Sequence, residues 1–321
     1  MAPREIRVED LDTEKFIREK GEEMARVVGD GRAINALSGG VDSSAVTVLA
    51  HRALGARIET VFIENGLMRE GESGSVVATF AGLGIPVRVI DARARFFAAL
   101  AGLTDPEDKR NAITKTFYST VFGPLVRDSG ATFLLHGTIL TDVEETVAGI
   151  KRQHNILAQL GIDPEKAYGY RVLEPLIELR KPAVRKLARA LGLPASVYAR
   201  PPFPGPALAA RVIGEVTPED VALVRAATTI VEAELSGFGA FQCMAILHGE
   251  RVPGMRHGRR EYGRQIEVRC WDTADAVSAR PTAVPFATLV RLGERISSEV
   301  PGVVSVTYNV TAKPPSTMEA V

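Results

Sequence analysis

Seven residues near the start of the chain, SGGVDSS over Ser38–Ser44, have the types and spacing of a phosphate-binding loop. The adjacent glycines Gly39 and Gly40 let the backbone turn tightly and approach a ligand with no Cβ atom in the way. The main-chain amides of such a loop, with the first turn of a helix behind them, form a cradle for an anion. Three serine hydroxyls add donors suited to phosphate oxygens. The loop therefore predicts binding of a phosphorylated ligand.

A carboxylate, Asp42, lies inside this loop. Its charge is unfavourable beside bound phosphates unless a cation bridges the two, so we expect Asp42 to hold Mg²⁺. The loop lacks the GxxxxGK[ST] spacing and the lysine of a Walker-type loop, and it also lacks the GxGxxG pattern of a dinucleotide site. The alternative interpretation is a turn that only joins a strand to a helix. We disfavour it because motif and predicted context agree.

The segments around the loop predict alternating strands and helices. Apolar runs predict strands over 33–37, 58–63, 87–90 and 132–135, and periodicity or composition predicts helices over 13–28, 44–54, 70–83 and 114–127. Strand and helix in alternation predict parallel βαβ units, hence an α/β fold with a doubly wound parallel sheet. Sites in such sheets lie beyond the carboxyl ends of the strands, which is where the loop falls.

Two stretches of the sequence mark boundaries. Residues 137–170 are polar and poorly periodic, which predicts a mobile lid, and RPPFPGP at 200–206 predicts a rigid connector. Beyond the connector, patterning predicts helices over 218–234 and 285–300 and strands over 240–247, 265–270 and 303–310. We therefore predict an α/β domain that carries the phosphate-binding loop over 1–200 and a smaller α+β domain over 201–321.

Composition narrows the functional classes. Lys plus Arg total 39, as do Asp plus Glu, so the balanced charge argues against a broad nucleic-acid footprint. No apolar stretch reaches the roughly 18–20 residues of a membrane span, and the N-terminus has no apolar signal core, which favours the cytoplasm. The two cysteines, Cys243 and Cys270, fit no metal motif and are expected to be free thiols.

The loop is also the signature of the N-type ATP pyrophosphatases, and further strings resemble one family in that group, the GMP synthases. In family order they are ENGLMR at 64–69, FFAALAGLTDPEDK at 96–109, GTI at 137–139 with Asp142, Glu145 and Thr146, IK at 150–151, HN at 154–155, PFPGP at 202–206, GEVT at 214–217 and KPPST at 313–317. The resemblance is collinear from about Asp30 to the C-terminus.

This resemblance implies a fold and a reaction. The fold is an adenine nucleotide alpha hydrolase-like sheet followed by a dimerisation domain, so a homodimer is expected. The reaction splits ATP between its α and β phosphates, adenylates the C2 oxygen of XMP, and lets ammonia displace AMP to give GMP. No glutaminase domain precedes the loop in this sequence, so ammonia is expected from a separate glutaminase subunit or from solution.

Roles follow from matched positions. Pyrophosphate and ATP are expected on Ser38, Gly39, Gly40, Val41, Ser43, Ser44 and Gly137, with adenine beside Val61, Phe62 and Ile63 at the end of the second strand. Asp42, with Asp142 or Glu145, is expected to hold Mg²⁺. Lys151 and His154 are expected on a lid that closes over the triphosphate. The acceptor is expected on Arg200, Arg211, Lys313, Thr317 and Glu319, the phosphate on Lys313.

The sequence also departs from the family pattern, mainly in the lid and the substrate region. Gln153 replaces one of two adjacent histidines, His136 replaces a glutamine, and the TIEWE ending becomes TMEAV at 317–321. Two alternatives therefore stay open. One is a paralogue that adenylates a related purine nucleotide or another carbonyl acceptor, with ammonia or a sulfur donor as nucleophile. The other is a non-catalytic nucleotide-binding partner subunit.

Overall fold

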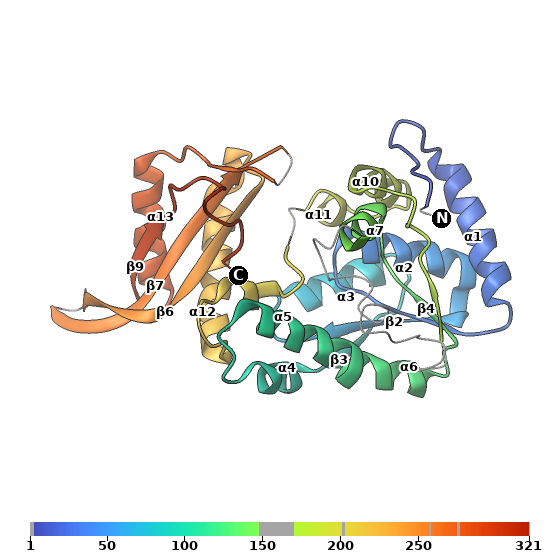
Figure 1. Ribbon diagram of the computed structural model, residues 1–321, viewed down its shortest axis with the longest axis horizontal. Helices are drawn as coiled ribbons and strands as arrows, with labels where there is room; N and C mark the ends of the chain where they lie inside the picture. Colours follow the sequence, from blue (N-terminus) through green and yellow to red (C-terminus); the bar gives the residue numbers. More distant parts are fainter. Residues whose placement is uncertain (1–2, 148–169, 201–202, 257, 275–276, 321) are drawn as a thin grey trace. The chain divides into compact units, whose positions relative to one another are not determined.

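The computed structural model describes residues 3–147, 170–200, 203–256, 258–274 and 277–320 (Figure 1). The chain forms two compact units. The first unit comprises Met1–Glu64, Glu72–Asp91 and Phe117–Arg200, and the second comprises Asn65–Gly71, Ala92–Thr116 and Pro201–Val321. Two short segments before residue 200 thus belong to the second unit. The linear division into 1–200 and 201–321 stays a prediction.

The first unit is built on a five-stranded sheet with the order β3-β2-β1-β4-β5, in which every pairing is parallel. Its strands are β1 (Ala33–Ala36), β2 (Ile58–Glu64), β3 (Arg88–Asp91), β4 (Phe133–Leu135) and β5 (Arg171–Leu173). The chain runs outward from β1 through β2 to β3 and then returns to the other side of β1. This confirms the predicted parallel doubly wound sheet. The strand order reverses between β1 and β4, where such sheets bind ligands.

Helices flank this sheet. They are α1 (Thr13–Val28), α2 (Val41–Leu54), α3 (Glu72–Gly82), α6 (Gly123–Ser129), α7 (Leu140–Val147), α10 (Lys181–Ala190) and α11 (Ala195–Tyr198). The helices α1, α2 and α10 pack against one another. Helix α2 is buried on most of its faces, as expected of a helix between layers. None of the helices among the described residues is long and apolar enough to cross a membrane.

The helix expected over 114–127 is divided in the structure. Helix α5 (Pro106–Lys115) is followed by a π-helical stretch, Thr116–Phe122, and then by α6, which has Pro124 in its first turn. Proline is tolerated there because its missing N–H would have no partner inside the helix. Helix α7 occupies part of the expected lid, so residues 140–147 are not a loop. Residues 148–169 lie outside the described part of the chain.

The second unit is an α+β structure, as predicted. Its strands are β6 (Gln242–Arg256), β7 (Arg259–Asp272), β8 (Arg280–Pro281) and β9 (Val303–Tyr308), and its main helices are α4 (Arg93–Leu100), α5, α12 (Pro218–Leu235) and α13 (Phe286–Glu299). Strand β7 pairs antiparallel with β6 and β8 and parallel with β9. Thr217 caps the N-terminus of helix α12, because its hydroxyl accepts a hydrogen bond from Asp220 N at 3.1 Å.

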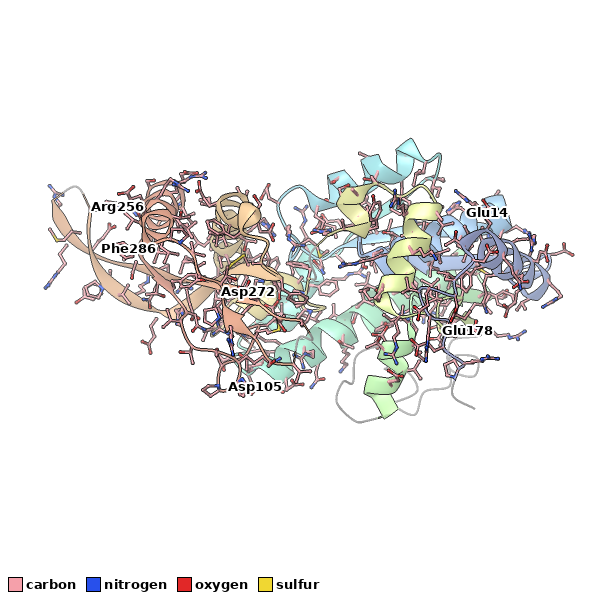
Figure 2. The ribbon with its side chains drawn as sticks, turned by 90° about the horizontal axis from the view of Figure 1, so that it is seen from above. Glu14, Asp105, Glu178, Arg256, Asp272 and Phe286 are labelled. Atoms are coloured by element: carbon pink, nitrogen blue, oxygen red, sulfur yellow. A yellow bond between two sulfur atoms is a disulfide. The ribbon has the colours of Figure 1, made fainter. Side chains whose placement is uncertain are left out.

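The hairpin β6–β7 is longer than the sequence predicted. The expected strands stopped at Leu247 and restarted at Gln265, because glycines and arginines interrupt the apolar pattern between them. A Cβ atom at Gly254 or Gly263 would lie 2.6 or 2.5 Å from side-chain atoms of Val304, so both glycines let the hairpin approach β9. Arg256, labelled in Figure 2, donates to Val303 O at 2.8 Å and ties the hairpin end to β9.

The expectation of free thiols is wrong. Cys243 and Cys270 form a disulfide between β6 and β7, and the described chain has no free cysteine. The two residues are direct cross-strand partners, with their Cα atoms 4.2 Å apart. A sequence separation of 27 residues carries no sign of this pairing, because the register of the hairpin, not the spacing, places the sulfurs together.

Candidate active site

The loop Ser38–Ser44 joins β1 to α2 at the carboxyl edge of the sheet. Gly39 has a φ of +78°, a conformation that suits glycine, and Gly40 is the N-cap of α2. The first backbone bond of the helix runs from Ser44 N to Gly40 O at 3.0 Å. The preceding amides therefore have no acceptor within the helix and face the space beyond the strand. This is the geometry of an anion cradle.

Hydrogen bonds within the loop fix its shape. The hydroxyls of Ser38 and Ser43 lie 2.9 Å apart, and the Ser38 amide donates to Ser43 Oγ at 3.2 Å. Ser43 Oγ in turn donates to Gly40 O at 3.1 Å. Ser44 differs from the other two serines, since its side chain is fully buried and its hydroxyl has no partner among the described residues. Two of the three expected hydroxyls therefore border the cradle.

A buried polar network supports the loop from below. Asn35 of β1 is 1% exposed, donates to Thr47 Oγ1 at 2.6 Å and accepts from Thr60 Oγ1 at 2.7 Å. Thr47 Oγ1 donates onward to Ser43 O at 2.7 Å. The network thus ties β1, β2 and α2 to the loop, and a satisfied buried network of this kind holds one arrangement. Asn35 lies within the apolar run 33–37, so the sequence pattern alone does not predict this role.

Gly39 is backed by an ion pair. Arg200 Nη1 lies 2.6 Å from Glu72 Oε1, the glutamate side chain is 4% exposed, and a Cβ on Gly39 would lie 3.3 Å from that oxygen. Arg185 also donates to Arg200 O at 3.3 Å. The structure therefore places Arg200 in the first unit, behind the phosphate loop. The other residues expected to bind the acceptor belong to the second unit.

Gly137 follows β4 across the point where the strand order reverses. A Cβ at Gly137 would lie 3.1 Å from Ser43 N and 3.2 Å from the carbonyl carbon of Asp42, so the glycine lets two backbones meet. The next residue, Thr138, donates to Glu174 Oε1 at 2.5 Å and is 2.8 Å from His136 Nδ1. The structure thus brings Gly137 and the loop together, as expected of neighbouring strand ends.

Beside this contact lies a partly buried tyrosine. Tyr118 Oη is 3.3 Å from His136 Nε2, so a chain of hydrogen bonds runs from Tyr118 to Glu174. Burial, together with the nearby Tyr170 and Glu174, raises the pKa of Tyr118 to about 12. The tyrosine is therefore a neutral hydroxyl at neutral pH.

Asp42 has a partner that the sequence did not suggest. Its Oδ2 lies 2.5 Å from the ammonium of Lys181, the first residue of α10. The side chain of Asp42 is 23% exposed, and that of Lys181 is 46% exposed. The spacing of 139 residues hid this pair, although the Arg-Lys-Pro sequence at 180–182 marks a helix start.

The carboxylates suit a metal site that the protein forms together with substrate phosphates, not one formed by protein ligands alone. Among the described residues, no three His, Cys, Asp or Glu side chains cluster as a metal-binding group. Mg²⁺ is commonly held by one or two carboxylates together with substrate phosphates, and Asp42 beside the cradle suits that arrangement. Asp142 Oδ2 accepts from Ile139 N at 3.0 Å within its own turn. The Glu145 side chain and all of Lys151 and His154 lie outside the described residues.

The expected adenine residues lie inside the sheet. Strand β2 continues to Glu64, so Val61 and Ile63 are not its last residues, and they are 0% and 7% exposed. Phe62 is 1% exposed. Val61 O also accepts from Leu37 N at 2.8 Å. Their assignment to adenine stays a prediction.

In the second unit, Arg211 and Glu319 meet. Arg211 is fully buried, its Nε lies 3.4 Å from Glu319 Oε2, and neither terminal nitrogen has a partner among the described residues. Gln242 Nε2 donates to Glu319 Oε1 at 2.8 Å. The Arg211 guanidinium also lies 5.0 Å from the centre of the Phe203 ring. Buried donors without acceptors are costly, so these nitrogens suit an anion.

The C-terminal segment is held by its backbone. Arg269 Nη1 donates to Thr317 O at 2.8 Å, and Trp271 Nε1 donates to Met318 O at 3.2 Å. Lys313 exchanges backbone hydrogen bonds with Ala279 at 2.9 and 3.0 Å. The sequence pattern does not single out either residue, because Arg269 lies within the predicted strand 265–270 and Trp271 directly follows it.

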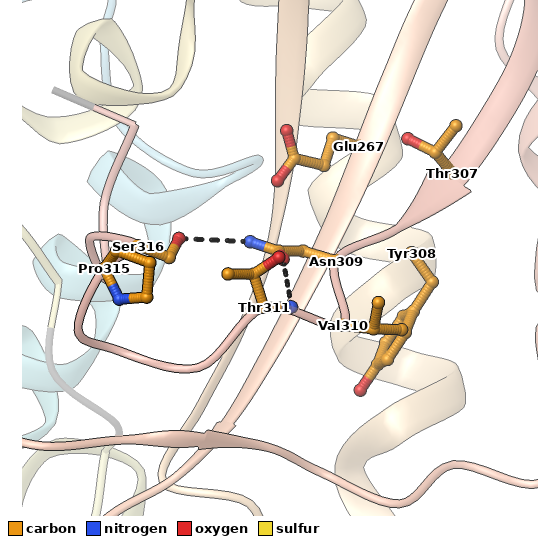
Figure 3. A pocket seen from close by; sticks show the side chains of 8 residues that line it. All are labelled: Glu267, Thr307, Tyr308, Asn309, Val310, Thr311, Pro315 and Ser316. Atoms are coloured by element: carbon orange, nitrogen blue, oxygen red, sulfur yellow. Dashed lines mark hydrogen bonds between the residues drawn. The ribbon is translucent and has the colours of Figure 1, made fainter.

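A cavity of about 510 Å³ adjoins this segment (Figure 3). Pro315 and Ser316 line it on one side and Glu267 on another, and Ser316 Oγ accepts from Asn309 Nδ2 at 3.3 Å. Burial would raise the pKa of Glu267, but hydrogen bonds from Arg269 and His248 outweigh it and hold the pKa below the usual value. The cavity wall therefore carries a carboxylate at neutral pH.

The loop at the strand-order reversal, with a carboxylate poised beside an anion cradle, belongs to the ATP pyrophosphatases of the N type. Comparison with known proteins narrows this class. The chain is 47% identical over 309 residues to a subunit of the glutamine-hydrolyzing GMP synthase of Pyrococcus furiosus, covering 95% of this chain and 97% of that protein. It is 44% identical to the subunit of the same name from Archaeoglobus fulgidus, with coverage of 96% and 99%. The chain belongs to this family of GMP synthase subunits, whose members are ligases.

Two further comparisons each match part of the chain. Residues 231–320 match the family model of the GMP synthase C terminal domain. A solved NH3-dependent NAD synthetase from Campylobacter jejuni, in complex with the nitrate ion, aligns with a TM-score of 0.47 and 16% identity over 59% of this chain and 78% of that one.

Proposed function

We propose that this chain converts XMP to GMP in two steps. In the first, the C2 oxygen of XMP attacks the α-phosphate of ATP, the bond to the β-phosphate breaks, and pyrophosphate leaves. In the second, ammonia attacks C2 and AMP departs with that oxygen. The observation that carries the proposal is the amide cradle of Ser38–Ser44 at the strand-order reversal, in a chain with 47% identity to a GMP synthase subunit.

The cradle suits the leaving group of the first step. Pyrophosphate carries growing negative charge as it leaves, and the amides at the start of α2, which have no acceptor within the helix, suit that charge. The hydroxyls of Ser38 and Ser43 bond each other and Gly40 O, so they would have to rotate to donate to pyrophosphate. Because Gly39, Gly40 and Gly137 carry no side chain, the backbone can approach the phosphates closely. Val41 contributes its amide to this cradle, and Ser44 supports it from behind, because the Ser44 amide donates to Gly40 O and closes the first turn of α2.

Asp42 is proposed to hold Mg²⁺ together with the phosphates, with Asp142 or Glu145 as a further carboxylate. When bound, the ion would neutralise charge on the pyrophosphate oxygens. Lys151 and His154 are proposed to close over the triphosphate and exclude water. Val61 and Ile63 are proposed to border adenine through the backbone of β2, since their side chains are buried.

The acceptor phosphate is proposed to bind in the second unit. The buried guanidinium of Arg211 has two nitrogens without partners among the described residues, and Lys313 adds a second cation near the chain end. Thr317 and Glu319 shape this site, Glu319 by orienting the guanidinium from 3.4 Å. Arg200 is proposed to assist the acceptor indirectly, by supporting Gly39 from behind the loop.

A pyrophosphate-release assay tests the proposal. With Mg-ATP, XMP and ammonium, we expect pyrophosphate and GMP in equal amounts. Asp42→Asn should abolish release while preserving the fold, because the loop backbone is unchanged. Release only with another purine nucleotide would support a paralogue, and no release with any acceptor would support a non-catalytic nucleotide-binding subunit. The absence of GMP at high enzyme concentration overturns the proposal.

Two partners are proposed. The relatives' name denotes one subunit of a glutamine-hydrolysing enzyme, which supports a separate glutaminase subunit as the ammonia source. We expect ammonium, but not glutamine, to support GMP formation by this chain alone. A homodimer is supported by apolar side chains on the second unit: Phe286 and Val290 lie one turn apart on α13 and are 80% and 43% exposed. Sedimentation of the wild-type chain and of Phe286→Ser tests the dimer.

A further inference from the structure

The side chain of Arg269 holds the C-terminal segment in the second unit. Its Nη1 donates to Thr317 O at 2.8 Å and to Glu319 O at 3.3 Å, and the residue is only 9% exposed. An arginine side chain is long and flexible, so it loses much rotamer freedom when it is held in one place. Its buried charge is also costly without a paired anion. Another group therefore has to orient Arg269 and balance its charge.

Glu267 meets both needs. It lies two residues before Arg269 on β7, so the two side chains leave the same face of the sheet. Arg269 Nε donates to Glu267 Oε1 at 2.6 Å, and the two side chains are 11% and 14% exposed. Because the guanidinium is planar, a bond to Nε sets its plane and leaves Nη1 for the C-terminal segment. The other carboxylate oxygen of Glu267, Oε2, lies 2.8 Å from His248 Nε2, which fixes the carboxylate in turn.

The carboxylate of Glu319 depends on the backbone that Arg269 holds. Glu319 Oε2 lies 3.4 Å from Nε of the buried Arg211, and Glu319 Oε1 accepts from Gln242 Nε2 at 2.8 Å. A shift of about 1 Å away from these partners would take both contacts beyond hydrogen-bond distance. Misplacement of that size is enough to weaken a site even when the altered residue lies outside it.

We propose that Glu267 is a positioning residue for the acceptor site. It acts through Arg269, which sets the backbone of Thr317–Glu319 and hence the place from which the Glu319 carboxylate reaches Arg211. The role requires no contact between Glu267 and the acceptor. This inference rests on the proposed function, because it assumes that XMP binds beside Arg211 and Glu319.

A direct role has to be separated from this one. Glu267 also lines the cavity in Figure 3, where its carboxylate would meet a ligand without the help of Arg269. A double-mutant cycle with Arg269→Met distinguishes the two roles. If Glu267 acts only through Arg269, its replacement causes no further loss once Arg269 is gone. A direct contact with a ligand would instead add to the loss.

Steady-state kinetics measure the effect on the acceptor. We expect Glu267→Gln to raise the KM for XMP about tenfold and to leave the KM for ATP and kcat within about twofold, because lost ground-state binding appears in KM. In the Arg269→Met background the same change should alter the KM for XMP by less than about twofold.

Glu234→Gln is the matched control. Glu234 lies on α12 in the same unit, is 15% exposed, and pairs with Arg291 at 2.9 Å and Arg295 at 2.8 Å. The variant therefore removes an equally buried carboxylate charge from arginine partners that do not hold the C-terminal segment. Its KM for XMP should stay within about twofold of the wild-type value.

The single tryptophan of the chain gives a readout that needs no turnover. Trp271 is 1% exposed, and its Nε1 donates to Met318 O at 3.2 Å. A loosened C-terminal segment admits acrylamide to the indole, so quenching of Trp271 fluorescence should rise about twofold in Glu267→Gln. Quenching in Glu234→Gln should match that of the wild type. Circular dichroism confirms that each variant is folded.

An unchanged KM for XMP in Glu267→Gln would overturn the inference, and so would additive effects of Glu267→Gln and Arg269→Met on that KM. Failure of the proposed function is distinct, because the wild-type chain would then form no GMP from Mg-ATP, XMP and ammonium. In that case equal quenching of Trp271 in Glu267→Gln and in the wild type would overturn the inference.

Discussion

Substitution of Gly39 by alanine tests whether the backbone of the phosphate loop is shaped as described. Gly39 has a φ of +78°, where an L-residue pays roughly 1–2 kcal/mol. The new Cβ would also lie 2.9 Å from Val76 Cγ2 and 3.3 Å from Glu72 Oε1. Overpacking of a filled site adds about 1–3 kcal/mol. The expected destabilisation of the first unit is therefore about 2–5 kcal/mol.

Thermal unfolding of purified variants measures this effect. At about 2–4 °C per kcal/mol for a unit of this size, the midpoint should fall by roughly 4–20 °C. Gly74→Ala is the matched control, because Gly74 lies in α3 beside the same loop and its added Cβ would meet nothing within 4 Å. It should stabilise by about 0.5–1 kcal/mol. A Gly39→Ala midpoint equal to that of the wild type would refute the positive φ and the close contact with α3.

Three other variants probe separate parts of the sites. Gly137→Ala should leave stability within about 1 kcal/mol but lower kcat roughly tenfold, because the backbone of Asp42 must shift by a few tenths of an ångström; unchanged kcat would show that the contact is unimportant. Lys313→Ala should raise the KM for XMP more than that for ATP, and equal changes would place the acceptor phosphate elsewhere. Glu267→Gln should lower the free energy of unfolding, with the full loss above pH 4.5. The loss should vanish as pH falls through the lowered pKa of Glu267, because protonation then removes the same charge in the wild type. A loss of stability that persists in acid would show that the charge of Glu267 is not its cause.

The sequence predicted the parallel sheet and the loop well because both signals are local. A short apolar strand, a glycine pair and a helix start lie within about 20 consecutive residues, so one window contains the whole site element. The same windows could not reveal Asn35 or Lys181. Asn35 reads as a polar interruption in an apolar run, and Lys181 meets Asp42 only after the intervening strands have paired.

The predictions from sequence were wrong where tertiary contacts override the local pattern. The hairpin β6–β7 continues through Gly254 and Gly263 because β9 packs against the positions that lack side chains, although glycine weakens an isolated strand. The disulfide follows from the same hairpin, since its register sets Cys243 opposite Cys270. Strand register depends on the whole hairpin. The number of residues between the two cysteines therefore does not predict their pairing.

The altered C-terminal sequence bears on the acceptor in a way that only the contacts reveal. Met318 and Ala320 pack against the buried cluster that contains Trp271, whereas Glu319 points to Arg211 and Gln242. Arg269 and Trp271 donate hydrogen bonds to backbone carbonyl oxygens of this segment, which every residue type provides. Alanine in place of an aromatic residue at position 320 therefore changes the packing volume. It leaves the backbone hydrogen bonds and the Glu319 carboxylate in place. For this reason the substitution at position 320 favours a repacked tail around the proposed XMP site over a change of acceptor.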